Sequence, residues 1–543
     1  NWTDGFDAVF RERYGYDLIP HLPELAYVVD DRIVSRVRRD FHDCLTHLFT
    51  AAFARQIGVW CDEHNLEHTG HVLEEPGLER QTNVVGSAMR FYEHMQAPGI
   101  DILCGQGLAR EGGSTPEWLT AKQCSSVKHQ FGRRWMLSET YGCTGWHFTF
   151  AEHKAVGDWQ AALGVNLRCQ HLSWYTMLGQ AKRDYPASIF FQSSWWRDYD
   201  VVEDYFARLH VLLTEGTPVR EIGVLHPIEG AWSVYGAVPE QIKQLDRDLQ
   251  TLQAILLQQH FDFDYVDEDI LARHGRVDGD RLQVARAAYR ILIVPPALTL
   301  TAATVATLTQ FVQNGGTLVF AGEPPACVDC TPDGAVAELA RRATAVALDR
   351  DAVVSALAAV AGQRVRVCRD NEEYEHTLCM LRHDPQNHRH ILFVCHTRQD
   401  EDSGDLEVSL PCSGQVQEWC AADGTVHAVD AASSGAQATF TTSLPPYGSR
   451  LFVIDEAGDD ALPPQPVYRE QRRCDLAPPT WAIERNEPNA IVLDRPAWRL
   501  DGDDWQRPLE VLKVDMKVRD ELGLQHRGGR MYQPWAQPAA AGP

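Results

Sequence analysis

The feature that most constrains the fold of this chain is an alternation between helical stretches and short apolar runs before Arg220. Between Ile33 and Trp60, apolar residues recur at three- and four-residue steps, which predicts a long amphipathic helix with one buried stripe. The stripe consists of Val37, Phe41, Leu45, Leu48, Phe49, Phe53 and Ile57. Short apolar runs follow in "GHVLEEPG", "GIDILCG", "RRWMLSETYG" and "LGVNLRCQH", with helical stretches between them. This order predicts a parallel sheet with helical crossovers.

Polar residues stand at the carboxyl ends of these apolar runs. In a (β/α)8 barrel the active site gathers at that end of the strands, so the pattern favours an α/β fold with a (β/α)8-type barrel in residues 1–220. Only about four or five strand–helix units precede Arg220, whereas a closed barrel needs eight. We therefore expect a barrel that is incomplete on its N-terminal side, in a chain whose two ends both look cut from something longer.

The pattern changes twice after Arg220. In residues 221–367, "EIGVLHPI", "FDFDYVDEDIL", "RILIVPP" and "GGTLVFAG" have the character of strands and are separated by helices, which predicts a flavodoxin-like α/β domain. In residues 368–456 the period becomes two, as in "HILFVCHT", which predicts an antiparallel β-domain. Residues 457–543 are rich in Trp, Pro and charge, and we expect a linker and the start of another module there, with a strand in "NAIVLDRPAWRLDG".

The composition excludes several classes of partner and cofactor. The net charge is −25, so electrostatics oppose binding to nucleic acid or to an anionic membrane, and no apolar run reaches the ~18–20 residues of a membrane helix. The 14 cysteines are scattered, and Cys327 and Cys330 form the one tight CxxC pair. The histidines show no metal spacing, and no GxSxG, P-loop or HExxH motif occurs. We expect reduced thiols, a cytoplasmic location, no metal and no cofactor.

Acids at the ends of two apolar runs are the candidate catalytic residues. His71, Glu74 and Glu75 close "GHVLEEPG" just before a Pro-Gly break, and Glu139 ends another run before a glycine-rich turn. Glycosidic cleavage needs two carboxylates from different strand ends, because one protonates the leaving oxygen while the other attacks or activates water. The acids at these two strand ends therefore suggest a glycosidase.

Each acid also has a structural interpretation. The glutamates of "LEEP" have the alternative of a solvated loop, and Glu139 has that of a salt bridge with Arg133 or Arg134. Asp101 starts the strand expected in "GIDILCG" and is interpreted as structural. Aromatic rings and imidazoles on the predicted loop ends would give a sugar an apolar platform with polar rims. These candidate substrate-binding residues are His71, Tyr141, Trp146, His171, Trp174, Trp195 and Trp196.

Several longer motifs carry a resemblance to a known family. "FRERYGYDLIPHLPEL", "WCDEHNLEHTGHVLEEP", "MLSETYGCTGW", "KRDYPASIFFQSSWW" and "IGVLHPIEGAW" resemble bacterial multidomain glycoside hydrolases labelled α-L-rhamnosidase, similar to glycoside hydrolase family 106. The resemblance covers roughly residues 10–232. It implies a (β/α)8 barrel, a flavodoxin-like domain like the trimerisation domain of family 42 β-galactosidases, and β-domains that include a galactose-binding-like module starting within residues 457–543.

The resemblance also implies site residues. Glu75, with Glu74, and Glu139 would be the acids, and His71 and His171 would line the pocket. Family 106 is associated with calcium, for which the chain shows no obvious run of ligands. Further acids of such proteins typically lie upstream of the segment with which this chain begins.

We therefore expect a glycoside hydrolase that cleaves a terminal sugar from an oligo- or polysaccharide, with α-L-rhamnosidase-like specificity. Glu139 would be the nucleophile or general base and Glu75 the general acid, or the roles would be exchanged. The alternatives are a β-galactosidase-like exo-glycosidase and a non-catalytic carbohydrate-binding or scaffold protein. The expected partner is a carbohydrate, and the flavodoxin-like domain is a candidate surface for a homo-oligomer.

Overall fold

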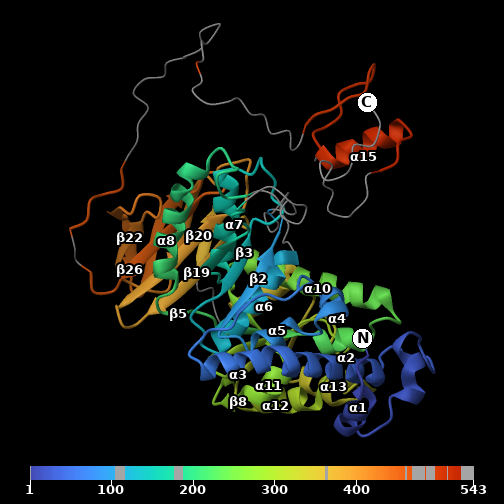
Figure 1. The fold of residues 1–543 in the computed structure, drawn as a ribbon. Helices are drawn as coiled ribbons and strands as arrows, with labels where there is room; N and C mark the ends of the chain where they lie inside the picture. Colours follow the sequence, from blue (N-terminus) through green and yellow to red (C-terminus); the bar gives the residue numbers. More distant parts are fainter. Residues whose placement is uncertain are drawn as a thin grey trace.

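The computed structural model describes residues 2–103, 105, 116–175, 188–360, 365–458, 461–466, 484, 496–509 and 511–526 (Figure 1). The main sheets follow one another along the chain: first a four-stranded parallel sheet, then a five-stranded parallel sheet, and then a pair of antiparallel sheets. None of the helices in these residues is long and apolar enough to cross a bilayer.

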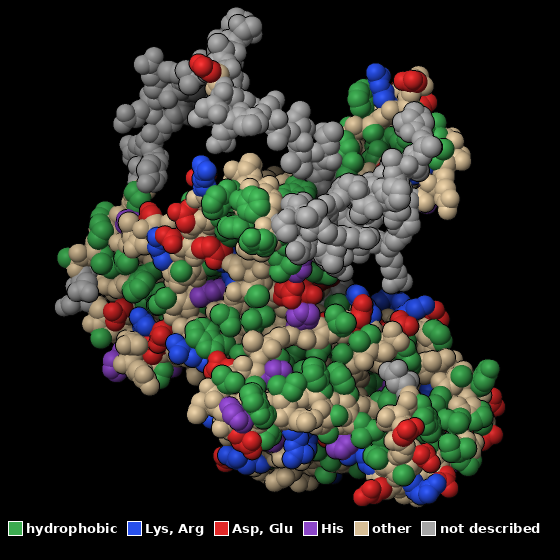
Figure 2. All heavy atoms as spheres, in the orientation of Figure 1, with side chains coloured by type: hydrophobic (Ala, Val, Ile, Leu, Met, Phe, Trp, Pro, Cys, Tyr) green, Lys and Arg blue, Asp and Glu red, His purple; other side chains and the backbone are tan. Residues whose placement is uncertain are grey.

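The predicted N-terminal helix forms, but its apolar stripe is only partly buried. Helix α2 (Arg36–Phe49), the π-helical turn η2 (Thr50–Arg55) and helix α3 (Gln56–Glu63) run on continuously, after the short helices α1 (Phe6–Tyr14) and η1 (Ile19–Leu25). The Ser35 side chain caps α2 by accepting a hydrogen bond from the Arg38 amide. Phe49 and Phe53 are 39% and 47% exposed, so the expectation of a fully buried stripe is wrong at these residues; apolar side chains show over this region in Figure 2.

The first parallel sheet is a half-barrel. Its strands lie in the order β1 (Thr69–Gly70), β2 (Ala97–Ile102), β3 (Leu137–Thr140) and β4 (Leu167–Gln170), and all neighbours are parallel. The connecting and following helices are α4 (Leu78–Val84), α5 (Ala88–Tyr92), α6 (Pro116–Gln130), α7 (Phe150–Ala162) and α8 (Asp200–Leu213). These four strands are half the number of a closed barrel.

The second parallel sheet has the order β16 (Thr344–Val346), β13 (Thr317–Ala321), β11 (Ile291–Val294), β6 (Ile222–His226) and β7 (Phe263–Asp267). Counted along the chain this is the strand order 2-1-3-4-5 of flavodoxin-like sheets. Strands β6, β7 and β11 are buried at every position because helices cover both faces. These helices are α9 (Ile228–Trp232), α10 (Pro239–Gln258), α11 (Glu268–His274), α12 (Ala302–Gln313), α13 (Ala335–Ala340) and α14 (Arg350–Ala358).

The strand expected in "FDFDYVDEDIL" is shorter than predicted. It ends at Asp267, whose side chain accepts hydrogen bonds from the amides of Asp269 and Ile270 and so begins helix α11. The sequence pattern also missed an antiparallel meander of β8 (Gly275–Asp278), β9 (Arg281–Val284) and β10 (Ala287–Tyr289). Three further short strands, β12 (Thr299–Leu300), β14 (Cys327–Val328) and β15 (Thr331–Pro332), form a small separate sheet.

Two antiparallel sheets enclose a common apolar core. One has the order β23 (Val426–Ala428), β22 (Gln415–Trp419), β26 (Ser449–Asp455), β20 (Arg389–His396), β19 (Thr377–Asp384) and β5 (Thr217–Pro218). The other has the order β18 (Glu372–Glu373), β17 (Arg366–Arg369), β21 (Asp405–Leu410), β25 (Gln437–Ser443) and β24 (Ala431–Ser434). Helices α7 and α8 of the half-barrel lie against the six-stranded sheet, where Tyr205 Oη is 2.8 Å from Ser449 Oγ (Figure 1).

The domain boundaries after residues 220, 367 and 456 stay predictions. Strand β5 precedes the first boundary yet belongs to the antiparallel sheet, because it pairs with Arg382 and His383 of β19. Beyond residue 456 the described residues contain helix α15 (Val511–Glu521). Half of the strand predicted in residues 489–502, namely 489–495, lies outside the described residues.

Candidate active site

Acidic and imidazole side chains meet at the carboxyl edge of the half-barrel sheet. Strands β2 and β3 pair so that Asp101 lies opposite Glu139, while His71 follows β1 and His171 follows β4. Because the strands are parallel, these side chains come from one edge of the sheet. Potential ligand atoms of His71, Asp101 and Glu139 all lie within 4.8 Å of one another. We call these four residues, together with Glu75, the strand-end cluster.

A hydrogen-bonded ion pair holds Glu139 in its ionised form. His71 donates from Nε2 to Glu139 Oε2 at 3.0 Å and from Nδ1 to the Val72 carbonyl at 2.9 Å, so both ring nitrogens face acceptors. The hydrogen bond to Glu139 raises the pKa of His71 to about 9, and the same bond lowers the pKa of Glu139. His171 Nε2 lies 3.9 Å from the other carboxylate oxygen. Glu139 is therefore a carboxylate at neutral pH.

Glu139 does not form the salt bridge that was its structural alternative. Its ion pairs within the described residues are with the two histidines. Arg133 instead donates to the Glu93 carbonyl, and the Arg134 guanidinium stacks over the Trp135 ring at 4.5 Å. A strand-end glutamate with 27% of its side chain exposed is thus available to react.

Asp101 was missed as a site residue. It does not start its strand: β2 begins at Ala97 and Asp101 is its last residue but one. Burial, with the nearby charge of Glu139, raises the pKa of Asp101 to about 6. Its Oδ1 is buried and has no hydrogen-bond partner among the residues that the structure describes. The signal in the sequence was an acid inside an apolar run. Like Glu139, it lies near the carboxyl end of its strand.

Glu75 is the most buried acid of the cluster, and its surroundings favour the protonated carboxyl group. The side chain is 4% exposed, and the Tyr92 hydroxyl lies 3.2 Å from Glu75 Oε1. Burial is the main cause that raises the pKa of Glu75 to about 7; the charges of His71 and Asp101 act on it in opposite directions. Gln81 and Gln123 both donate to the Glu75 carbonyl and fix this part of the backbone.

The neighbouring Glu74 does not belong to the cluster, and its prediction as a catalytic residue is not supported. Its φ of 63° turns the chain in the left-handed region, and its side chain is part-exposed and ion-paired with Arg80. Adjacent residues in an irregular segment point to different sides, so only one of the two glutamates reaches the cluster.

Tyr141 lies inside the fold instead of lining a substrate site. It is 1% exposed. Its hydroxyl donates to the His153 carbonyl at 2.9 Å and accepts from Arg168 Nη2 at 3.0 Å. Its phenol group therefore ties the end of β3 to helix α7 and strand β4, and its ring is unavailable to stack on a sugar.

The four candidate tryptophans fall into two groups. Trp146 and Trp174, on the loops after β3 and β4, meet edge to face at 6.1 Å; Trp174 is 5% exposed, so the partly exposed Trp146 is the candidate for a sugar platform in this pair. Trp195 is partly buried; it packs against the apolar core, with its ring 5.3 Å from that of Tyr199. Trp196 is exposed, and its ring lies 5.6 Å from Phe190.

The fold assembles two groups of possible metal ligands that the linear spacing conceals. One is His71, Asp101 and Glu139; the other is His383, His390 and Glu456 in the six-stranded sheet. One imidazole with two carboxylates suits a transition metal better than calcium, which takes six to eight oxygen ligands. The first group is thus a poor match for calcium.

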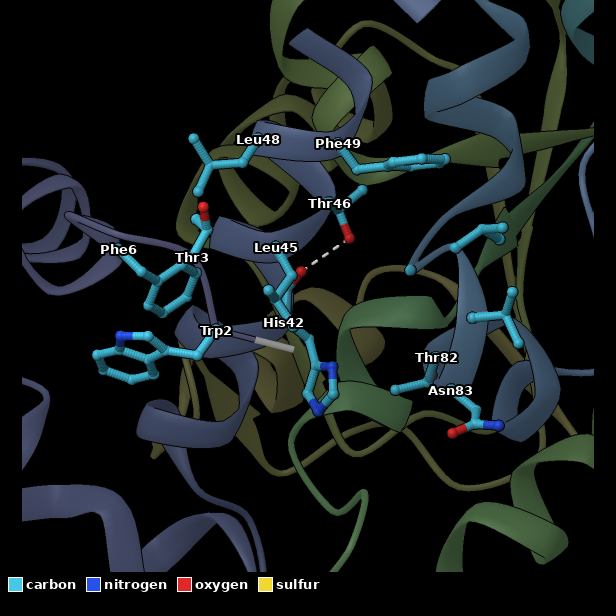
Figure 3. Close-up of a pocket in the computed structure, with 13 residues that line it drawn as sticks. Trp2, Thr3, Phe6, His42, Leu45, Thr46, Leu48, Phe49, Thr82 and Asn83 are labelled. Atoms are coloured by element: carbon cyan, nitrogen blue, oxygen red, sulfur yellow. Dashed lines mark hydrogen bonds between the residues drawn. The ribbon is translucent and has the colours of Figure 1, made fainter. Parts of the chain in front are cut away.

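A separate cavity of about 250 Å³ lies between α1, α2 and α4 (Figure 3). Trp2 and Phe6 face Leu45 and Leu48 across it, and the lining includes no carboxylate. No candidate site residue lines this cavity, so it is distinct from the strand-end cluster.

Solved structures similar to this one are glycosidases. The rhamnosidase from Novosphingobium sp. PP1Y matches with a TM-score of 0.65 and 20% identity over 87% of this chain and 44% of its own. The family 42 β-galactosidase Gan42B from G. stearothermophilus matches with a TM-score of 0.59 and 12% identity over 83% of this chain and 75% of its own. At these identities the likeness shows the fold alone.

The sequence has relatives of the same kind. A protein of Formosa agariphila, provisionally named a beta-glucuronidase, is 24% identical over 328 residues, which are 59% of this chain and 25% of that protein. The chain thus spans a quarter of this curated relative and less than half of the Novosphingobium enzyme. Residues 1–431 match the family described as alpha-L-rhamnosidase, and the chain belongs to this family, glycoside hydrolase family 106.

Proposed function

We propose that this chain carries the acid and base of a glycosidase that removes a terminal α-L-rhamnosyl residue from an oligo- or polysaccharide. Glu139 acts as general base or nucleophile on one side of the sugar, and Glu75 acts as general acid on the glycosidic oxygen. One observation carries the proposal: two carboxyl groups of the same cluster have pKa values that their surroundings shift in opposite directions. Such a divergence separates acid from base in carboxylate pairs.

The base is supported by His71. Both ring nitrogens of His71 donate hydrogen bonds, so the imidazolium neutralises the charge of Glu139. Its hydrogen bond goes to Oε2 and not to the second carboxylate oxygen. Among the described residues, the charged donor nearest to the other oxygen of Glu139 is His171 Nε2, at 3.9 Å. An oxygen of this kind can accept a proton from water or attack the anomeric carbon.

The acid is supported by burial. A carboxyl group whose pKa is about 7 holds its proton over much of the neutral range and can release it to a leaving oxygen. Asp101 lies opposite Glu139 on the neighbouring strand, and it adds a further negative charge to the cluster when it ionises. We assign to Asp101 the role of adjusting the charge around the two other acids.

A panel of aryl glycosides tests this function. We expect the full-length protein to release phenol from an aryl α-L-rhamnoside with a kcat/KM at least about 100-fold above that for the matching β-D-galactoside and β-D-glucuronide, since family membership is the best guide to the sugar. Galactoside or glucuronide as the best substrate would move the specificity to another sugar. Turnover of none of them, with binding retained, would favour the non-catalytic alternative.

A further inference from the structure

A basic cavity of about 350 Å³ lies at the opposite end of the half-barrel from the strand-end cluster. It is bounded by the C-terminus of α6, the turn before β3, the turn before β4, and strands β5 and β19. Its cationic lining residues are Lys128, Arg133, Arg134, Arg220, Arg286 and Arg382. His129, Ser125, Thr214 and Thr217 also line it, whereas no aspartate or glutamate does. This concentration of positive charge is unexpected in a chain whose net charge is −25.

Two of the three buried cations of this cavity, Lys128 and Arg382, have neutral hydrogen-bond partners. Lys128 Nζ donates to the Gly164 carbonyl at 3.0 Å. Arg382 donates to the carbonyls of Glu215 and Gly216 at 2.7 and 2.8 Å. Neither forms an ion pair with a carboxylate within the described part of the chain. Carbonyl oxygens satisfy the N–H groups but leave the positive charge uncompensated.

The pKa values of Lys128 and Arg382 are lowered by burial and by the neighbouring positive charges. Burial, followed by the charges of Arg382 and Arg220, holds the pKa of Lys128 well below its usual range. Burial and the charge of Arg220 lower the pKa of Arg382 to about 10. Three cations thus repel one another in a poorly solvated space.

The carboxylates that pair with Arg220 are shared with other cations. Arg220 pairs with Asp262 at 2.7 Å and with Asp264 at 2.8 Å. Asp262 also binds Lys122, and Asp264 also binds His129. These two acids are therefore committed to cations of their own. Glu215 and Asp384 act on the charge of Arg382 without forming an ion pair with it, and Asp384 is paired with Arg389.

Unused hydrogen-bond donors accompany the unbalanced charge. Arg220 Nη2 and Arg133 Nε are both buried, and neither has a hydrogen-bond partner among the described residues. Buried donors without a partner are rare in folded proteins, so these two indicate a place for a water, an ion or a ligand. The lining contains no Phe, Tyr or Trp side chain.

We infer that this cavity binds a tetrahedral oxyanion with two negative charges, of the phosphate or sulfate class. Guanidinium forks and an ammonium group match the oxygens of such an anion, and the three hydroxyl side chains add donors. The ligand would join the half-barrel, through Lys128 and Arg133, to Arg382 of the six-stranded sheet. Its effect is on the stability of this junction and not on the chemistry at the strand-end cluster.

Thermal unfolding of the full-length protein tests the inference. Sodium phosphate or sulfate should raise Tm saturably, by roughly 3–8 °C at a hundred-fold excess over Kd, whereas sodium chloride at the same ionic strength should not. A monosaccharide phosphate ester, which keeps close to two negative charges at neutral pH, is a third arm: binding at least ten-fold tighter than free phosphate would identify a sugar-borne anion, and weaker binding would identify the free ion. Equal shifts with chloride would overturn the inference.

Two kinds of variant place the effect in the cavity. Arg134 and Arg286 are exposed on its rim, so the double change Arg134→Gln/Arg286→Gln should leave the anion-free Tm unchanged and weaken phosphate at least five-fold. Lys128→Met should abolish the phosphate-dependent rise in Tm without lowering the anion-free Tm, because it removes a repelled charge. Arg341→Gln, at an exposed residue just after the C-terminus of α13, is the matched control and should bind phosphate as the wild type does. An undiminished phosphate shift in both cavity variants would contradict the assignment.

Discussion

Replacing Glu139 with glutamine lowers kcat by about 10³-fold or more and leaves Tm within about 2 °C of the wild type. The amide keeps the size of the carboxylate and still accepts the hydrogen bond from His71, so the local structure persists. It cannot take a proton from water or attack the anomeric carbon, so the chemical step is lost. Steady-state kinetics on an aryl α-L-rhamnoside and a melting curve on the same preparation measure both effects.

Glu74→Gln is the matched control for this variant. Glu74 carries the same functional group in the same segment as Glu75, but it pairs with Arg80 outside the cluster. We expect rates within about two-fold of the wild type, because exposed ion pairs contribute little. Wild-type rates in Glu139→Gln would end the assignment of Glu139, and a large fall in its Tm would show that the acid is structural.

Replacing Glu75 with glutamine has an effect that depends on the leaving group. We expect kcat/KM to fall about 10²–10⁴-fold on an alkyl rhamnoside, whose departing oxygen needs a proton. A dinitrophenyl rhamnoside leaves without protonation, so the same variant should lose less than about ten-fold on that substrate. Rates on a series of leaving groups measure the difference directly.

The outcome separates a proton donor from a packing residue. If Glu75 only fills space beside Tyr92, the substitution lowers the rate on both substrates alike, and its Tm falls as well. Asp101→Asn supplies the comparison within the cluster. As a residue that tunes its neighbours, Asp101 should show no such dependence on the leaving group.

Periodicity predicted the large elements well. The helix from α2 to α3 and the buried strands β6, β7 and β11 have strong local signals, because one covered face or two covered faces require a fixed spacing of apolar residues. The apolar run before Glu139 likewise predicted a strand that ends in an acid. The exposure of Phe49 and Phe53 could not be predicted, because an apolar stripe in the sequence does not show which segment of the chain packs against it.

The rest of the site depends on contacts between distant segments. Asp101 acquires its place from the pairing of β2 with β3, which aligns it with Glu139, and no feature of "GIDILCG" alone fixes that register. Glu74 and Glu75 are equivalent in the sequence, and the backbone turn at Glu74 decides which one is buried. Burial of Tyr141 follows from partners on α7 and β4.

The pH dependence of kcat/KM tests the central claim most directly, namely that Glu139 works ionised and Glu75 works protonated. The lowered pKa of Glu139 keeps the base active into acidic solution, whereas activity should fall as pH rises through about 7, where Glu75 loses its proton. In Glu75→Gln, assayed on the dinitrophenyl substrate, this loss at high pH should disappear. A basic limb that remains at the same pH in Glu75→Gln would contradict the account.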